Sequence, residues 1–174
     1  MNNPILETPR LQLRRFQISD TEAVYQYGSN LEVNKYTGEP PLKSLAEARN
    51  IITNVNFQDY KKYGYGRWAV VYKEDNLVIG FAGLKYLPEF DETDIGYRFL
   101  PEYWGKGIAT EASLPIIKYG FERLELNRII GIADPENFAS CKVLEKIGMK
   151  FYQKSNYEDS QKIYNWYKIE KEKI

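Results

Sequence analysis

Apolar and polar residues follow two different periods along this chain, and each period predicts its own kind of element. Alternation with a period of two is typical of strands, whereas apolar residues three or four positions apart indicate helices. The segments that read as strands are 11–16, 67–72, 77–86, 93–100, 127–133, 149–154 and 161–169. The segments that read as helices run from Ser19 or Asp20 to about Tyr27, and over 44–63, 108–124 and 137–147.

Several boundaries of these elements carry the residues that such boundaries favour. Ser44, with Glu47 three residues later, has the pattern of a capping box at a helix start. Gly148 is expected just beyond the last helix, where glycine readily adopts the left-handed conformation. The turn Glu74-Asp75-Asn76 predicts a hairpin. Pro115 should kink the helix that contains it, because proline removes one backbone hydrogen bond.

The order of the predicted elements indicates the fold class. It runs strand, two helices, three strands, helix, strand, helix and two strands. Residues 28–41 are rich in glycine, asparagine, threonine and proline and are expected to be a loop. We therefore expect one α/β (α+β) domain over residues 1–174, with a mixed sheet of about seven strands and about four helices. The chain contains no internal repeat, low-complexity segment or linker.

Composition and charge narrow the functional classes. Lys+Arg and Asp+Glu each number 24, so the basic excess usual in nucleic-acid binders is missing and no such partner is expected. No apolar run approaches the roughly 18 residues that span a bilayer, so we expect no membrane partner. Residues 1–7 lack the pattern of a secretory signal. With Cys141 as the only cysteine, these features predict a cytoplasmic protein without an internal disulfide.

The absence of histidine excludes two common kinds of active site. Neither a Ser-His-Asp hydrolase nor a histidine-based zinc site can be built from this sequence. Acid–base chemistry must come from Asp, Glu, Tyr, Ser, Lys, Cys or water, and no metal is expected. Cys141 is expected to pack in the interior, as single cysteines commonly do.

The most informative segment joins the predicted strand 93–100 to the helix that follows it. Gly105 and Gly107 precede that helix, and a helix start presents free N–H groups with partial positive charge. Because glycine lets a ligand approach the backbone, the turn suits a phosphate group. The P-loop pattern is absent, and Thr110 departs from the dinucleotide-binding fingerprint. The glycines alone leave open a tight turn without a ligand.

The sequence Trp104-Gly105-Lys106-Gly107-Ile108-Ala109 resembles motif A of the GNAT superfamily, the Gcn-five-related N-acetyltransferases. That motif is Arg/Gln-x-x-Gly-x-Gly/Ala, and Trp104 stands in place of Arg or Gln. The wider phrase, through Ala112, resembles the branch of ribosomal-protein N-terminal acetyltransferases, in which tryptophan is common here. Residues 8–14 resemble that branch's opening strand, while 137–140 and 144–149 resemble its motif B.

This resemblance covers nearly the whole chain and implies a fold, a cofactor and a set of binding residues. The family sheet is split in a V, and acyl-CoA is wedged where the motif A strand and the next strand separate. Acetyl-CoA would be the co-substrate. Backbone N–H groups of the turn would hold its pyrophosphate, and the exposed strand backbone would bind the pantetheine arm and polarise the thioester. The residues so implied are Phe99, Leu100, Gly105, Lys106, Gly107, Ile108, Ala109, Thr110, Asn137 and Ser140.

Two catalytic roles remain open between alternatives. Ser140 is the first candidate to protonate the departing thiolate, although Asn137 and Ser140 also suit a helix start and Tyr152 or another tyrosine could replace Ser140. Asp94 or Glu92 is the candidate general base, since members of the superfamily often place an acidic base on this strand. These two carboxylates could equally belong to a solvated acidic rim. Candidate walls of the acceptor site are Trp68, Tyr97 and the loop 28–41, although core packing is the more usual role for a residue such as Trp68.

The resemblance predicts transfer of an acetyl group to a primary amine such as a protein N-terminus. Alternatives are a small amine (an antibiotic, a polyamine or an amino acid) and a binding module that holds coenzyme A without catalysis. An acidic cleft would favour a polyamine. Dimers occur in the resembling branch, so a homodimer is a further expectation.

Overall fold

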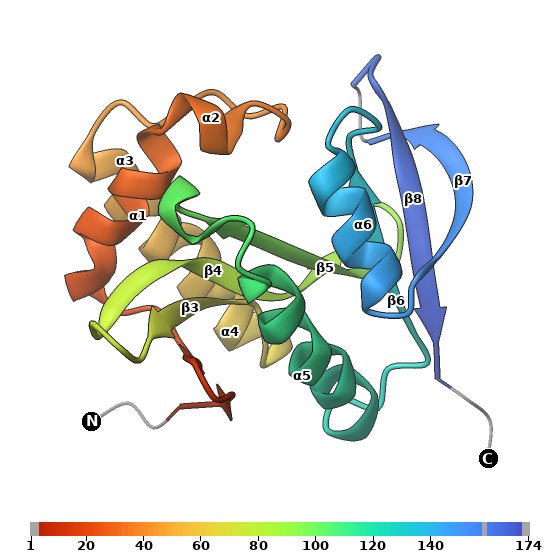
Figure 1. Ribbon diagram of the computed structural model, residues 1–174, viewed down its shortest axis with the longest axis horizontal. Coiled ribbons are helices and arrows are strands. Elements are labelled where there is room, and N and C mark those ends of the chain that lie inside the picture. The colour runs from red at the N-terminus through yellow and green to blue at the C-terminus, as the bar shows by residue number, and fades with distance from the viewer. Residues whose placement is uncertain (1–3, 158–159, 172–174) are drawn as a thin grey trace.

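The computed structural model describes residues 4–157 and 160–171, which form one mixed sheet with helices on both faces (Figure 1). The sheet has eight strands in the order β1-β2-β3-β4-β5-β6-β8-β7. The strands are β1 Leu6–Glu7, β2 Leu11–Arg14, β3 Arg67–Tyr72, β4 Leu77–Leu87, β5 Glu92–Phe99, β6 Arg128–Ala133, β7 Lys150–Asn156 and β8 Ile163–Glu170. All neighbours are antiparallel except β5 and β6, which are parallel.

The helices divide between the two faces of the sheet. They are η1 Ile18–Asp20, α1 Thr21–Ser29, α2 Leu31–Asn34, α3 Leu45–Ile51, η2 Ile52–Asn56, α4 Phe57–Tyr63, η3 Pro101–Tyr103, α5 Ile108–Glu122 and α6 Phe138–Lys146. The alternation of β3 shows the division, because Trp68 and Val70 pack in one cluster with Ile116 of α5. Ala69 points the other way, into a cluster with α1 and η2. Period-two alternation therefore builds a core on each face.

The sheet is split where its two halves meet. Strands β4 and β5 share eight register pairs, whereas β5 and β6 share only Asp94 with Ile130. Beyond that pair the two strands diverge, and the half that carries α6, β8 and β7 stands apart from the rest (Figure 1). The remainder of β5, towards Phe99, faces this gap. The expected V-shaped split is thus confirmed, and it exposes backbone groups to a ligand.

The predicted strands and helices are all present, and the main differences from the observed elements are the following. All seven predicted strands are present, and β1, only two residues long, was not predicted. The expected loop 28–41 is corrected by α2, whose start is capped because Asn30 Oδ1 accepts the N–H groups of Glu32 at 3.0 Å and Val33 at 3.2 Å. The predicted helix 44–63 is continuous but contains the π-helical turn η2.

The predicted caps and turns also have counterparts in the structure. The Ser44 hydroxyl accepts the Glu47 N–H at 3.2 Å, and Gly148 has a φ of 90° beyond α6. Pro115 lies inside α5, as expected. One expectation, the absence of a signal over residues 1–7, includes residues 1–3, which lie outside the described residues.

Candidate active site

The turn before α5 contains two glycines in the left-handed conformation and is bonded to β5 by a tryptophan side chain. Gly105 has a φ of 71° and Gly107 a φ of 74°, a backbone conformation that favours glycine. A Cβ atom on Gly105 would meet no atom within 4 Å, and one on Gly107 only the Arg10 guanidinium at 3.8 Å. The Trp104 indole donates a hydrogen bond to the Phe99 carbonyl at 2.8 Å. Trp104 therefore ties the turn to the end of β5.

The start of α5 presents the anion-binding groups expected from the sequence. The first hydrogen bond within the helix runs from the Glu111 N–H to the Gly107 carbonyl at 3.0 Å. The N–H groups of Ile108, Ala109 and Thr110 precede that bond and so have no acceptor within the helix. All three residues line the large cleft described below. Their N–H groups and the helix dipole favour a phosphate at this position.

Glu111 anchors this helix start to the turn between β1 and β2. Its carboxylate accepts hydrogen bonds from the Thr8 hydroxyl at 2.6 Å, from the Arg10 N–H at 3.0 Å and from Arg10 Nε at 2.6 Å. Partial burial raises the pKa of Glu111, but the bonds from Thr8 and Arg10 outweigh it, and the pKa is lowered overall. The ionised carboxylate thus fixes the helix that presents the N–H groups.

A cleft of about 990 Å³ runs from this turn through the gap between β5 and α6 to the loop after α2. It is large enough for a cofactor and a small acceptor group together. Of the expected binding residues, the structure brings these to the cleft: Phe99, Gly105, Gly107, Ile108, Ala109, Thr110, Asn137 and Ser140. Lys106 and Leu100 do not line it: the Lys106 ammonium lies 5.5 Å from the Tyr103 ring.

At the end of β5, the backbone N–H groups of Phe99 and Leu100 face opposite edges of the strand. The Leu100 N–H donates to the Ile79 carbonyl of β4 at 3.0 Å, so this group faces into the sheet. Because backbone groups alternate between the edges of a strand, the Phe99 N–H faces the gap instead. An extended ligand arm could accept a hydrogen bond from Phe99, while the Leu100 N–H is already bonded.

Ser140 lies in the first turn of α6 and is paired with a tyrosine from β5. Asn137 caps the helix by accepting the Ser140 N–H on its Oδ1 at 3.1 Å. The Tyr97 hydroxyl lies 3.0 Å from Ser140 Oγ and donates to the Ser140 carbonyl at 3.1 Å. Burial raises the pKa of Tyr97, with the hydrogen bond to Ser140 opposing it, so Tyr97 stays protonated. This pairing links positions 43 residues apart and was not predicted.

Asp94 and Glu92 lie on the same face of β5 but have different surroundings. Asp94 is 8% exposed, lines the cleft and forms an ion pair with Arg67 of β3. Burial raises the pKa of Asp94, and the charge and hydrogen bond of Arg67 oppose that rise. Glu92 is outside the cleft lining and accepts a hydrogen bond from Arg128 Nε of β6 at 3.1 Å. The structure thus places Asp94, but not Glu92, beside the cleft.

The other residues considered from sequence are packed or distant. Cys141 is buried, with its sulfur 3.7 Å from the Asp134 carbonyl oxygen. Tyr152 is exposed on β7 and does not line the cleft. Within residues 4–157 and 160–171, no group of three or more acidic or cysteine side chains could hold a metal ion. In the same ranges no helix combines the length and apolar character that crossing a bilayer requires.

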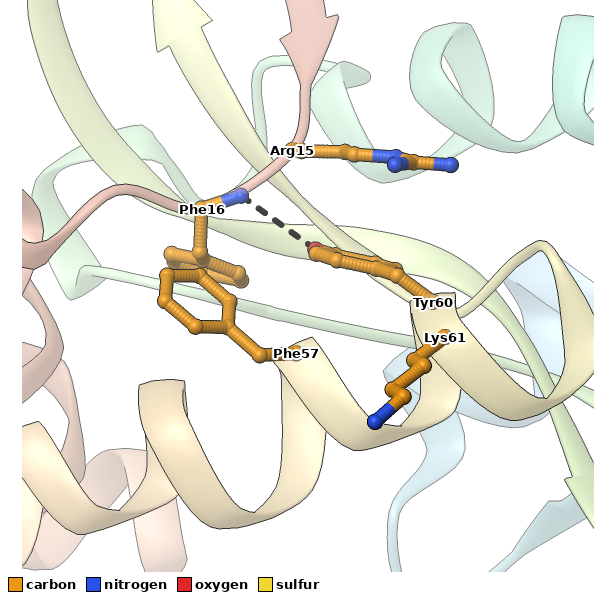
Figure 2. A pocket seen from close by; sticks show the side chains of 5 residues that line it. All are labelled: Arg15, Phe16, Phe57, Tyr60 and Lys61. Carbon is orange, nitrogen blue, oxygen red and sulfur yellow. Dashed lines mark hydrogen bonds between the residues drawn. The ribbon is translucent and has the colours of Figure 1, made fainter.

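A second, smaller hollow of about 290 Å³ lies between the end of β2 and α4 (Figure 2). The Arg15 guanidinium lies over the Tyr60 ring, 5.1 Å from its centre, and the Lys61 amine points away from the aromatic rings. The Tyr60 hydroxyl accepts the Phe16 N–H at 3.2 Å and donates to the Arg67 carbonyl. The Tyr60 hydroxyl is therefore already bonded, and no chemistry is assigned to this hollow.

The helix-start turn, the split sheet and the cleft that joins them form a site suited to an extended ligand that bears a phosphate. Comparison with known proteins identifies the family: the model of the acetyltransferase (GNAT) domain matches residues 10–150. The chain belongs to this family and is an N-acetyltransferase.

Relatives of known sequence and structure support this assignment. An uncharacterized N-acetyltransferase, p20 of Bacillus licheniformis, is 37% identical over 83% of this chain and 82% of its own. A GNAT-family acetyltransferase from Bacillus anthracis has a TM-score of 0.80 at 30% identity, over 95% of this chain and 97% of its own. The spermidine N(1)-acetyltransferase of Escherichia coli K12 is 28% identical over 79% and 72% of the two chains.

Proteins that share the fold have been solved with coenzyme A or acetyl-CoA bound. One is a ribosomal L7/L12 α-N-protein acetyltransferase in complex with coenzyme A. Its TM-score is 0.80 at 19% identity, over 97% of this chain and 98% of its own, a likeness that concerns the fold.

Proposed function

We propose that this enzyme acetylates a primary α-amine, with the N-terminus of a protein or peptide as the acceptor. The observation that carries the proposal is the pairing of the carboxylates that line the cleft. Of the four that line the cleft among the described residues, three are paired with a cation: Asp94 with Arg67, Glu39 with Arg98, and Asp134 with Lys162. The fourth is Glu32, which is exposed.

This pattern disfavours a polyamine acceptor. A polycation is attracted by several carboxylates whose charge is not already balanced, and here the paired cations offset most of that field. A single amine needs only one acceptor of its proton. The relationship to a spermidine acetyltransferase keeps the small-amine alternative worth testing, because that enzyme's name states a polyamine acceptor.

Asp94 is the proposed general base. Burial raises the pKa of Asp94, which makes its carboxylate a stronger base than usual, and the charge and hydrogen bond of Arg67 oppose that rise. An α-amine has a pKa of about 7.7 to 8.0, and roughly a tenth is already neutral at pH 7. A lysine-type amine, at about 10.4, would require a stronger base. A carboxylate base is therefore better suited to the α-amine than to a lysine side chain.

The proposed reaction uses the chain's own groups at each proton transfer. The amine nitrogen attacks the thioester carbonyl carbon, and the Phe99 N–H stabilises the oxyanion that forms. The carbon–sulfur bond then breaks and releases the coenzyme A thiolate. Asp94 takes the proton that the amine loses, and the Ser140 hydroxyl donates a proton to the thiolate sulfur. The Tyr97 hydroxyl supports Ser140 from 3.0 Å. Exchange with solvent restores both groups after the products leave.

An acceptor screen tests the acceptor class. A peptide with a free N-terminus and no lysine, an N-terminally blocked peptide with one lysine, and spermidine would each be incubated with acetyl-CoA. Release of the coenzyme A thiol and mass spectrometry would report transfer. We expect acetylation of the free N-terminus alone. Preferential turnover of spermidine would contradict the α-amine proposal, and coenzyme A binding without any turnover would support the binding module instead.

Two further expectations remain proposals: a homodimer and a cytoplasmic location. Light scattering of the purified protein tests the first, and fractionation of expressing cells tests the second.

A further inference from the structure

A row of small residues crosses the sheet beside Asp94 and makes room for one arginine. Arg67 of β3 is in register with Gly83 of β4, and Gly83 with Gly96 of β5. Neither glycine presents a side chain on this face, so the Arg67 side chain can lie across β4 and reach β5. Asp94, two residues before Gly96, stands on the same face of β5.

The Arg67 guanidinium holds Asp94 by both its backbone and its side chain. Nη1 donates to the Gly83 carbonyl and to the Asp94 carbonyl, the latter at 3.0 Å, while Nη2 donates to Asp94 Oδ2. The two side chains are 16% and 12% exposed, so solvent screens the pair weakly. Asp94 Oδ1 is buried without a regular hydrogen bond among the described residues. Arg67 thus fixes the orientation of the carboxylate through Oδ2.

Gly96 is required by this arrangement and not by its own backbone. Its φ is outside the left-handed region, so another residue could adopt its conformation. A Cβ atom at this position would overlap the Arg67 guanidinium. The glycine therefore serves the arginine, and replacing it tests the contact without removing the positive charge.

Among the described residues, the other charged and titratable groups around Asp94 do not form an ion pair with its carboxylate. Lys85 of β4 is the register partner of Asp94, but its ammonium lies 3.5 Å from Asp59 Oδ2 of α4. From β6, the Ile132 N–H lowers the pKa of Asp94, and on β5 itself the protonated Tyr97 is a neighbour. Arg67 is thus the cation that contacts the carboxylate.

We propose that Arg67 is a positioning residue that keeps Asp94 ionised and fixes the orientation of its carboxylate beside the cleft. This inference rests on the proposed function of Asp94 as the base. Burial raises the pKa of Asp94, and the charge of Arg67 is the largest opposing influence. Without Arg67 the carboxyl group would be protonated at a higher pH and would lose its orientation.

The direct test is an NMR titration of the Asp94 carboxyl carbon in ¹³C-labelled protein. The signal is assigned by its loss in Asp94→Asn. Arg67→Gln should raise the midpoint by about one to three pH units, the range for removing an adjacent arginine. Gly96→Ala should shift it in the same direction by less, and Arg67→Lys should restore part of the wild-type value. Thermal unfolding and acetyl-CoA binding would show that each variant is folded.

Lys85→Gln is the matched control, because it also removes one positive charge facing Asp94. Its shift should be clearly smaller than that of Arg67→Gln. An equal shift would overturn the proposal by showing that the general field, and not the contact, ionises Asp94. An unchanged midpoint in folded Arg67→Gln would overturn it as well.

Kinetics then connect the titration to catalysis. With an acceptor whose amine pKa lies below the pH range studied, the acidic limb of kcat/KM should follow the Asp94 midpoint in each variant. A uniform loss of activity at all pH values, with the limb unmoved, would indicate a merely structural arginine and overturn the proposal. The NMR titration needs no turnover, so a shifted midpoint in a protein that acetylates no amine would count against the proposed function alone.

Discussion

The turn from Trp104 to Thr110 and the Asp94–Arg67 pair lie along the same cleft, yet they are built in different ways. The turn is made of consecutive residues, and its functional groups are backbone N–H groups at a helix start. The pair joins side chains 27 residues apart that meet only because β3, β4 and β5 are in a particular register. The first site is local and the second is tertiary.

This difference explains why the two sites tolerate different changes. A backbone site is damaged mainly by side chains that fill it or alter its conformation, since its own side chains take little part. A site made of side chains depends on the identity of each member and on the glycines that let them meet. Substitutions at the two sites should therefore separate cofactor binding from chemistry.

The largest expected effect is on the turn. Gly107→Glu places a carboxylate where the pyrophosphate is expected and imposes a side chain on a φ of 74°. Because like charges brought together cost several kcal/mol, acetyl-CoA affinity should fall on the order of 100-fold or more. Isothermal titration calorimetry with acetyl-CoA measures this affinity in both proteins.

Gly64→Glu is the matched control for Gly107→Glu. Gly64 also has a left-handed φ, 81°, with open space at its Cβ position, and it lies outside the cleft. Gly64→Glu should therefore have a similar backbone strain but bind acetyl-CoA with the wild-type affinity. Equal loss in both variants would mean that strain, and not the turn, governs binding, and undiminished binding by Gly107→Glu would place the cofactor elsewhere.

The next effect separates the two candidate bases on β5. Asp94→Asn should lower kcat/KM by on the order of 100-fold, the lower range for loss of a general base. Glu92→Gln should leave kcat/KM close to wild type, because Glu92 faces Arg128 outside the cleft. Steady-state kinetics with a peptide acceptor decide the matter. The reverse order of effects would move the base to Glu92.

These two experiments concern features that the sequence revealed to different degrees. The elements, the split sheet and the glycine turn were predictable because hydrophobic period, helix caps and the motif are local signals. Strand β1 and helix α2 were missed because they span two and four residues, although Asn30 was an available cap signal for α2. The contacts of Tyr97 with Ser140 and of Arg67 with Asp94 depend on the register and packing of distant segments, which a single sequence does not contain.

A smaller effect is expected at Ser140. Ser140→Ala removes one hydrogen bond to the charged thiolate, and such a bond is worth about 1.5 to 3 kcal/mol, so kcat should fall about 10- to 100-fold. Acetyl-CoA affinity should change little, because the turn is untouched. Cys141→Ala is the control, since its buried sulfur faces the Asp134 carbonyl. If both variants lose kcat equally, packing at the start of α6 explains the loss and Ser140 is only a helix residue.

The smallest expected effect is on the stability of the fold, through the Glu111 contacts that hold the start of α5. Glu111→Gln should lower the free energy of unfolding at pH 7 by about 1 kcal/mol, because a neutral amide bonds Thr8 and Arg10 more weakly. Urea unfolding measures it. Glu122→Gln, on the same helix, is the control: its ion pair with Lys118 is exposed at 3.8 Å and should contribute little.

The difference in unfolding free energy between the wild type and Glu111→Gln should depend on pH, because the pKa of Glu111 is lowered. A carboxyl group whose folded pKa is below its ordinary value of 4.5 stabilises the fold above that value. The stabilisation is lost as the pH falls through the folded pKa, where the wild-type group becomes neutral like the amide. The two unfolding curves should therefore converge on acidification below about pH 4. A difference that persists unchanged there would show that the carboxylate charge does not fasten this helix start, and that shape alone holds it.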